Sequence, residues 1–281
     1  MSIELLSCPI CSAALFAKPE SAASVKTLSC DANHCFDRAK QGYWNLLAVQ
    51  QKKSKDPGDN AQMVSARREF LNLGYYQPLA QALSLQLQKT VQPDQSANIL
   101  DMGCGEGYYT AHCQQQLENH QFFGLDISKH AVKAATQRTK AITWLVASGA
   151  NMPLKDSSID IMTVVFSRLM PQAFADKLKT DATLVLVWPT DQHLIELKQA
   201  IYDDIKRSKY DPAAELDALF SVDSVTPCTF DFTIETAHDL TALLLMTPHG
   251  QKVNSQVRES LTNQLPLSLS FSVNIGCFKK R

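Results

Sequence analysis

Apolar residues recur in short runs along the chain, and their spacing predicts alternating strands and helices. Five runs of strand length cover residues 98–102, 121–126, 142–147, 159–166 and 183–187. Helical spacing follows at 129–138, 171–178 and 192–207. Residues 268–278 alternate apolar and polar side chains, like an antiparallel edge strand near the end of the chain. This order predicts an α/β domain built on a doubly wound, Rossmann-like sheet.

Glycines are concentrated at the end of the first predicted strand. Gly103, Gly105 and Gly107 are three of the ten glycines in the chain and fall within five positions. We expect a tight turn at Gly103, a close approach of backbone to a ligand at Gly105, and the start of a helix at Gly107. The second predicted strand ends at Asp126, 25 residues after Asp101. At that spacing a carboxylate can bind ribose hydroxyls, so the segment predicts a nucleotide-like ligand.

Glu106 within this loop bears on the class of ligand. A carboxylate at a helix N-terminus repels phosphate, so we expect a cationic ligand without phosphate rather than a dinucleotide. A glycine turn without any ligand is the simpler alternative, but strand, loop, helix, strand and terminal acid all occur in order. The string Ile99-Leu-Asp-Met-Gly-Cys-Gly-Glu-Gly107 resembles the first motif of class I S-adenosylmethionine (SAM) methyltransferases. The resemblance implies that the loop passes the methionine part of SAM and that Asp126 binds its ribose.

Length and composition suit one full α/β domain and a smaller module. The chain has 281 residues, and no apolar run reaches the roughly 18 residues of a membrane span. Its first residues contain no basic segment ahead of an apolar one. We therefore expect a cytoplasmic protein without a membrane partner. In such a protein the eight cysteines serve a metal site or the core rather than disulfides.

Four of the cysteines lie in the first 35 residues, and their spacing indicates a metal site. Cys8 and Cys11 fall on one tight turn, and Cys30 and His34 follow after a gap of 18 residues. This pattern predicts a zinc ribbon or knuckle with three cysteines and one histidine. Cys35 follows His34 directly, so the spacing leaves an all-cysteine site open, as well as four buried cysteines without metal. A module this small hardly builds its own core, and zinc would supply the missing folding energy.

Residues 36–68 are more basic than the rest of the chain. They carry a balance of +4, against −1 for the whole protein. The basic residues are Arg38, Lys40, Lys52, Lys53, Lys55, Arg67 and Arg68. Beside Tyr43 and Trp44, they suit a surface that binds phosphates and stacks bases. The simpler interpretation is a solvated loop before the turn at Pro57 and Gly58.

Several motifs along the chain resemble those of one family, in the same order. They occupy residues 37–47, 56–63, 66–71, 74–79, 126–129, 152–160 and 193–198. With the cysteine spacing, they are similar to the RlmA-type 23S rRNA (guanine-N1)-methyltransferases, which join a zinc module to a SAM-dependent domain. The resemblance implies zinc bound by Cys8, Cys11, Cys30 and His34. It also implies a homodimer that acts on a hairpin loop of 23S rRNA.

These observations predict three parts: a zinc-binding module (1–50), a basic, helical linker segment (51–95) and a SAM-dependent methyltransferase domain (96–281). The candidate cofactor-binding residues are Asp101, Gly103, Gly105, Gly107, Tyr109, Asp126, Ser148 and His193. The catalytic residue is not identified, and Ser167 and Arg168, after the fourth predicted strand, are the candidates near the methyl group. His193 and Glu196 lie one helical turn apart and would serve proton transfer or, more simply, helix packing.

The predicted reaction is direct transfer of the SAM methyl group to N1 of a guanine that has left its stack. Residues 166–171 and 179–182 depart from the family pattern, and the first of these loops faces both the methyl group and the target base. Two other functions stay open. One is a small-molecule SAM methyltransferase, against which the zinc module and the basic segment speak. The other is a non-catalytic RNA-binding or assembly protein that retains the SAM fold.

Overall fold

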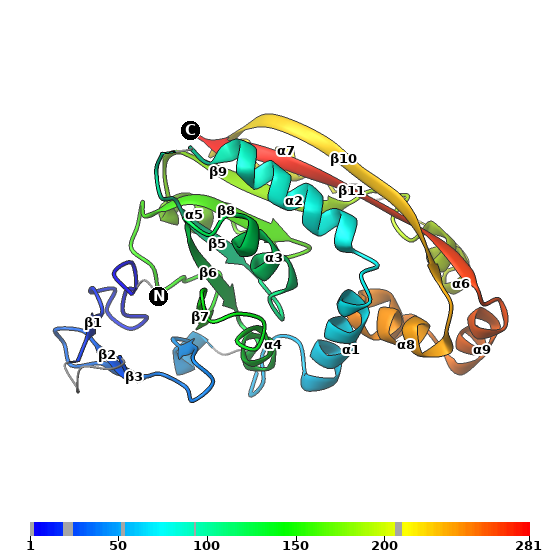
Figure 1. Cartoon of the computed structure of the whole chain (residues 1–281), viewed down its shortest axis with the longest axis horizontal. Coiled ribbons are helices and arrows are strands. Elements are labelled where there is room, and N and C mark those ends of the chain that lie inside the picture. Colours follow the sequence, from blue (N-terminus) through cyan, green and yellow to red (C-terminus); the bar gives the residue numbers. More distant parts are fainter. Residues whose placement is uncertain (1–2, 19–24, 52–53, 93, 206–209) are drawn as a thin grey trace.

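Two sheets organise the chain (Figure 1): a small antiparallel sheet near the N-terminus and a mixed sheet of eight strands. The computed structural model describes residues 3–18, 25–51, 54–92, 94–205 and 210–281. Lys52, Lys53 and the last two residues of the helix predicted at 192–207 therefore lie outside the described residues. The described part of that segment is helical only at Ile195–Ile201, so the predicted helix is too long. Within the described ranges, no helix combines the length and the apolar character needed to cross a membrane.

The small sheet has little core of its own. It consists of β1 (Phe16–Ala17), β2 (Thr27–Ser29) and β3 (Cys35–Asp37), all antiparallel. The apolar residues of this part, such as Leu6 and Leu28, are buried in a cluster that also contains Leu154 of the large domain. The Ser7 amide donates to the Pro153 carbonyl at 3.0 Å, which fixes the contact. The module is thus docked on the loop that follows residue 151.

The large sheet has the doubly wound order that the apolar runs predict. In space its strands are β10 (Phe220–Ile234), β11 (Leu267–Lys280), β9 (Leu178–Pro189), β8 (Ile159–Val165), β5 (Asn98–Met102), β6 (Gln121–Asp126), β7 (Thr143–Val146) and β4 (Trp44–Asn45). The strands from β9 to β4 are parallel, and β11 is antiparallel to both of its neighbours. After β5 the chain forms β6 and β7 on one side of it, and then β8 and β9 on the other side. The boundary between β5 and β8 is therefore the switch point where such sheets bind ligands.

The strand near the C-terminus does not lie where the sequence predicts. Residues 268–278 are predicted at the edge, but β11 lies between β9 and β10, and β10 forms the edge. Figure 1 shows β10 and β11 as a long, curved pair. Residues 221–227 of β10 are all exposed. Because this stretch buries no apolar face, its sequence lacks the alternation that predicts a strand, and pairing with β11 gives it its shape.

Helices cover the sheet on both faces (Figure 1) and form two separate cores. The first core receives α1 (Ala61–Asn72), α2 (Gln77–Thr90), α3 (Tyr108–Gln116), α4 (Lys129–Ala135), α6 (Ile195–Ile201), α8 (Ala237–Met246) and α9 (Ser255–Asn263). The second receives α5 (Pro171–Lys177), α7 (Pro212–Leu216) and the zinc module. Two 3-10 helices, η1 (Val49–Gln51) and η2 (Pro248–Lys252), lie in connections. Ile99 faces the first core and Leu100 the second, which explains the continuous apolar runs of the parallel strands.

The segment predicted as a linker contributes to the first core. Its helices α1 and α2 bury Phe70, Leu79 and Leu83 there. The chain also enters the large sheet before residue 50, because Trp44 of β4 pairs with Leu145 of β7. The domain boundaries near residues 50 and 95 remain predictions.

Candidate functional site

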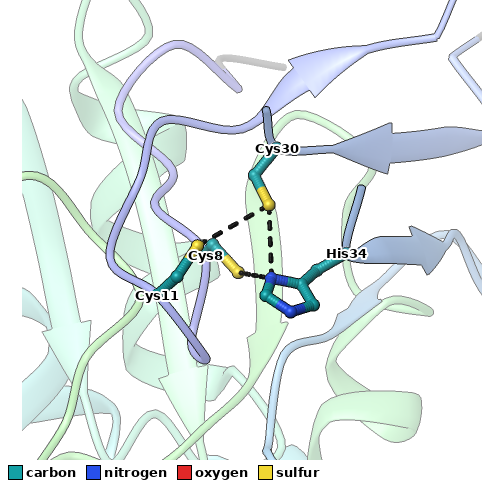
Figure 2. Close-up of side chains that lie close together, drawn as sticks. All are labelled: Cys8, Cys11, Cys30 and His34. Atoms are coloured by element: carbon teal, nitrogen blue, oxygen red, sulfur yellow. Dashed lines mark hydrogen bonds between the residues drawn. The ribbon is translucent and has the colours of Figure 1, made fainter. Parts of the chain in front are cut away.

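Figure 2 shows four side chains of the N-terminal module that converge from two turns: Cys8, Cys11, Cys30 and His34. Their ligand atoms all lie within 4.8 Å of one another. Cys11 Sγ lies 3.7 Å from Cys30 Sγ, and His34 Nδ1 lies 3.5 Å from Cys8 Sγ and 3.4 Å from Cys30 Sγ. A tetrahedron of ligands at zinc bond lengths has edges of roughly 3.5–3.8 Å. The four residues therefore fit one zinc ion, with Nδ1 as the histidine atom that would bind it.

Each of the two turns contains one residue with a left-handed backbone. Ser12 and Asn33 have φ values of 62° and 61°, and each closes a turn by donating its amide to the carbonyl of the first cysteine, Cys8 or Cys30, at 2.9 Å. The left-handed conformation at these positions lets the chain turn sharply enough to direct the sulfur atoms inward.

Cys35 points away from this cluster. It begins β3, and successive side chains of a strand point to opposite faces. Its Sγ lies 3.3 Å from Lys18 Nζ and 3.4 Å from the Asn33 carbonyl oxygen. Of the two neighbours that the spacing alone leaves open, the structure brings His34 to the other ligands.

The glycine loop joins β5 to α3, and its three glycines serve two purposes. Gly103, Gly105 and Gly107 have φ values of 80°, 55° and 81°. A Cβ on Gly103 would lie 2.3 Å from Ser167 Oγ, and one on Gly107 would lie 2.7 Å from the Trp144 ring. A Cβ on Gly105 would have its nearest neighbour at 3.8 Å. Gly105 thus leaves room for a ligand, whereas Gly103 and Gly107 allow close packing within the protein.

Asp126, at the end of β6, ties the glycine loop to the next helix. Its Oδ2 accepts a hydrogen bond from the Gly105 amide at 2.9 Å, and its Oδ1 accepts one from the Ser128 amide at 2.8 Å. Burial raises the pKa of Asp126, and these two hydrogen bonds oppose the rise. Each carboxylate oxygen has a further lone pair for an incoming hydroxyl, so the arrangement fits a ribose.

Asp101 lies beneath the loop and joins three elements. Its Oδ1 accepts a hydrogen bond from Thr163 of β8 at 3.0 Å, and its Oδ2 accepts one from Thr110 of α3. Burial raises the pKa of Asp101 to about 6, although the bonds from both threonines lower it. The carboxylate therefore holds the switch point of the sheet together.

Tyr109 and Ser148, two of the candidate cofactor-binding residues, lie in different elements. Tyr109 is in the first turn of α3, and burial raises the pKa of its hydroxyl. Ser148 follows β7 and forms a backbone bridge with Asn151. Ser167 contacts Gly103, whereas Arg168 beside it is exposed. Of the two catalytic candidates, Ser167 is thus the one that the structure places at the glycine loop.

His193 is buried between aromatic rings. Its ring centroid lies 5.9 Å from that of Phe166 and 4.8 Å from that of Phe271. Burial, with the positive charge of Lys198 nearby, lowers the pKa of His193 to about 3. Its Nδ1 accepts the Ser272 amide at 3.3 Å, so the neutral ring carries its proton on Nε2. A ring in this state does not accept a proton readily, which favours packing over proton transfer.

Glu196 also serves the packing of α6. Its Oε2 accepts the Ser270 amide at 3.0 Å, and its Oε1 accepts the Ser270 hydroxyl at 2.7 Å. Both oxygens therefore bind β11, the strand against which the helix lies.

Three charged residues that the sequence presents as free are paired within the protein. Glu106 is 1% exposed and forms an ion pair with Arg138, so it does not present an uncompensated charge that repels phosphate. Arg67 pairs with Asp59 and donates to the Met246 carbonyl, while Arg68 donates to the Ala134 carbonyl at 3.0 Å. The two arginines therefore hold α1 against its neighbours.

Tyr76 is a residue that sequence reasoning missed. It is 3% exposed and packs edge-on against Phe271, with ring centroids 4.5 Å apart. Its hydroxyl has no hydrogen-bond partner in the described part of the chain. It lies close enough to Tyr109 to help raise the pKa of that phenol. A buried hydroxyl without a partner, near Tyr109 of α3, suits a polar group that a bound ligand would bring. In the sequence it looks like any core tyrosine.

The fold and the two sites define the class of protein. The doubly wound sheet with an antiparallel strand between β9 and β10, the glycine loop and the acid after β6 are those of a class I SAM-dependent methyltransferase. A family model described as "Methyltransferase domain" matches residues 99–184. Another, described as "RlmA, N-terminal", matches residues 6–55 and corresponds to a zinc ribbon. The protein is therefore an enzyme with SAM as its cofactor and a zinc-binding module at its N-terminus.

Named relatives identify the family. The chain is 30% identical over 222 residues to the Bacillus subtilis (strain 168) protein "Putative 23S rRNA (guanine-N(1)-)-methyltransferase YxjB". The matched region covers 77% of this chain and 76% of that protein. It is 32% identical over 200 residues to the "23S rRNA (guanine(748)-N(1))-methyltransferase" of Streptomyces fradiae. That matched region covers 71% of this chain and 68% of the Streptomyces protein. The chain belongs to this family of 23S rRNA (guanine-N1)-methyltransferases.

Proposed function

We propose that the protein methylates N1 of a guanine in a hairpin loop of 23S rRNA, in the cytoplasm and as a homodimer. SAM supplies the methyl group, carried on a positively charged sulfur. Gly105, Asp126 and Tyr76 are the residues we expect to hold this cofactor, since they offer an open backbone, a carboxylate and a free hydroxyl. Family membership supports the choice of reaction and of substrate.

A basic groove carries the RNA part of the proposal. It has a volume of about 640 Å³ and lies where the zinc module meets the large domain. Lys26, Arg38, Lys40 and Lys140 line it, with Asp37 as the acidic residue. Thr27 donates to Asp37 at 2.7 Å, and the Lys140 ammonium donates to the Gln41 carbonyl at 3.0 Å. Four cations around an open groove suit the phosphates of a nucleic acid.

The basic residues of the groove are neighbours in space rather than in sequence. Lys26 and Lys140 lie outside the basic segment of the sequence, and folding brings them to Arg38 and Lys40. Arg38 also lies over Trp44, with 5.9 Å between the guanidinium carbon and the ring centroid. Residues 25–42 thus form most of the groove, and the large domain adds Lys140.

The residues at the glycine loop provide orientation more than acid–base chemistry. Attack by guanine N1 requires removal of its proton. His193 is poorly suited to this because of its low pKa and its bonded Nδ1. The Ser167 hydroxyl lies against Gly103 and is the polar side chain best placed to contact the reacting base. We therefore expect Ser167 to orient the base while water accepts the proton.

Primer extension tests the reaction. A 23S rRNA transcript without modifications, incubated with the protein and SAM, should acquire one new stop for reverse transcriptase, because N1-methylguanine cannot form a Watson–Crick pair. Methyl transfer to small molecules but not to rRNA would instead indicate the small-molecule alternative. Transfer to neither substrate would contradict the proposed function.

Charge reversal tests the groove. Lys40→Glu with Lys140→Glu should weaken binding to the transcript and flatten its salt dependence by about 0.7 for each lost contact with a single strand. Lys89→Glu with Lys252→Glu makes the same change in charge at exposed positions outside the groove and serves as the control. SAM affinity should be unchanged in both. Equal losses in the two double variants would refute the groove.

The homodimer and the location need separate tests. Sedimentation equilibrium of the purified protein should give twice the mass of the chain, which is 31.2 kDa. Cell fractionation should place the protein with ribosomal particles. A monomer at micromolar concentration would remove the dimer from the proposal without affecting the reaction.

A further inference from the structure

Phe166, the first residue after β8, has an unusual backbone and an unusual exposure. Its φ is 52°, in the left-handed region that β-carbon-bearing residues avoid. Its aromatic side chain is 42% exposed. The Phe166 amide nevertheless donates to the Val187 carbonyl of β9 at 3.2 Å, so the strained residue is held by the sheet. Backbone strain of this kind persists where the surrounding structure imposes it, and it often marks a functional position.

The position of Phe166 connects it to the cofactor loop. The next residue, Ser167, fits so closely against Gly103 that a Cβ there would lie 2.3 Å from its hydroxyl oxygen. Phe166 is therefore one residue from the loop, at the carboxyl edge of the sheet. Ligands of doubly wound sheets bind at this edge.

Buried rings support Phe166 within the protein. The His193 ring lies 5.9 Å away, with 32° between the ring planes, and Phe271 lies 6.4 Å away in an edge-on contact. His193 and Phe271 are 9% and 1% exposed. The ring of Phe166 is thus anchored by two buried rings, while part of its surface remains open to solvent. This arrangement presents an apolar, flat surface in a fixed orientation.

We infer that the exposed surface of Phe166 is the platform on which the target guanine stacks during methyl transfer. This inference rests on the proposed function and names a residue that positions its substrate. A base that has left its helix is held by stacking on aromatic side chains, and such stacking tolerates any purine face. His193 supports the ring in its neutral form and adds no charge beside the base.

Three variants test the platform. Phe166→Leu keeps an apolar side chain and removes the aromatic face, Phe166→Tyr keeps the face, and Phe166→Asn removes it while suiting the left-handed backbone. We would measure kcat/KM for transfer from tritiated SAM to the unmodified 23S rRNA transcript. The Leu and Asn variants should lose about five- to a hundredfold, which is the range for base–aromatic stacking, and the Tyr variant should remain close to the wild type. SAM affinity, measured by calorimetry, should be unchanged in all three.

Thermal unfolding separates stacking from a purely structural role. Because asparagine suits the left-handed backbone, Phe166→Asn should lose less stability than Phe166→Leu, although both lose transfer. A lower unfolding temperature with kcat/KM unchanged would show that Phe166 only packs, and would overturn the platform. An active wild type with an equally active Phe166→Leu variant would also overturn it and would leave the proposed function standing. A wild type that methylates no 23S rRNA would overturn the proposed function itself.

Discussion

The zinc module and the eight-stranded sheet differ in what stabilises them. Strands β1 to β3 have two or three residues each, and most of these residues are at least partly exposed. Strands β5 and β7, by contrast, are buried at nearly every position. The sheet therefore obtains its stability from apolar burial on two faces. The module lacks that source, so its turns depend on four ligand side chains and on contact with the large domain.

This difference also separates the two sites. In the module, one ion would join residues that are distant in sequence and hold the backbone in place. At the glycine loop, the backbone is held by the protein itself, through Asp126, Asp101 and the Glu106–Arg138 pair. We therefore expect metal loss to unfold the first part of the chain and cofactor loss to leave the second part folded.

The largest effect should follow from Cys11→Ser. Loss of one ligand should remove the single zinc ion expected per chain, and structural zinc in small modules contributes about 10–16 kcal/mol of apparent binding energy. Elemental analysis should show the loss, and hydrogen exchange should show fast exchange in residues 3–43 with β5 to β9 still protected. Cys35→Ser, at another exposed cysteine, should retain the metal. A wild-type protein that contains no metal but whose module amides still exchange slowly would contradict the dependence of the module on zinc.

The next largest effect should follow from Arg138→Ala in the large domain. This change leaves the Glu106 carboxylate buried without its partner, which costs about 3–5 kcal/mol. Urea unfolding monitored by circular dichroism measures the loss. Arg281→Ala breaks an ion pair with Asp217 whose side chains are exposed, and should cost less than about 1 kcal/mol. Similar losses in the two variants would show that the pair beneath the glycine loop has no special role.

A third prediction concerns the pH dependence of the large domain. The pKa of Asp101 is about 6 in the folded protein and near 4 in an unfolded chain. Its contribution to stability is therefore full below pH 4 and is lost as the pH rises through 6, by about 3 kcal/mol. Asp101→Asn should lack this part of the pH dependence in urea unfolding between pH 4 and pH 7. Parallel curves for the two proteins would argue against a raised pKa.

The smallest effect should be that of Asp126→Asn on the affinity for SAM. The change removes a carboxylate that would accept ribose hydroxyls and weakens one of its two hydrogen bonds from backbone amides, so calorimetry should show a loss of about ten- to a hundredfold. The fold should persist, in contrast to the zinc module without metal. Asp56→Asn, at an exposed aspartate that contacts His130, should bind SAM like the wild type. Unchanged affinity in Asp126→Asn would place the ribose elsewhere.

Local patterns in the sequence predicted the elements whose chemistry is local. The apolar runs of β5 and β6 and the glycines between β5 and α3 are found at the predicted positions, because continuous apolar residues and left-handed turns leave direct traces in sequence. The same holds for the turn at Cys8 and Cys11. The first half of β10 gives no strand signal because residues 221–227 bury no apolar face. With β10 missed, β11 was predicted at the edge that β10 occupies.

The contacts between side chains that are distant in sequence could be known only from the tertiary structure. The sequence alone determined that a doubly wound domain with a glycine loop follows a cysteine-rich module, since periodicity and spacing are properties of short segments. It could not show that Arg138 neutralises Glu106, that Arg67 and Arg68 hold helices, or that Lys26 and Lys140 line one groove. The reach and direction of a side chain depend on how its element packs, and folding alone places Phe166 between two buried rings and the solvent.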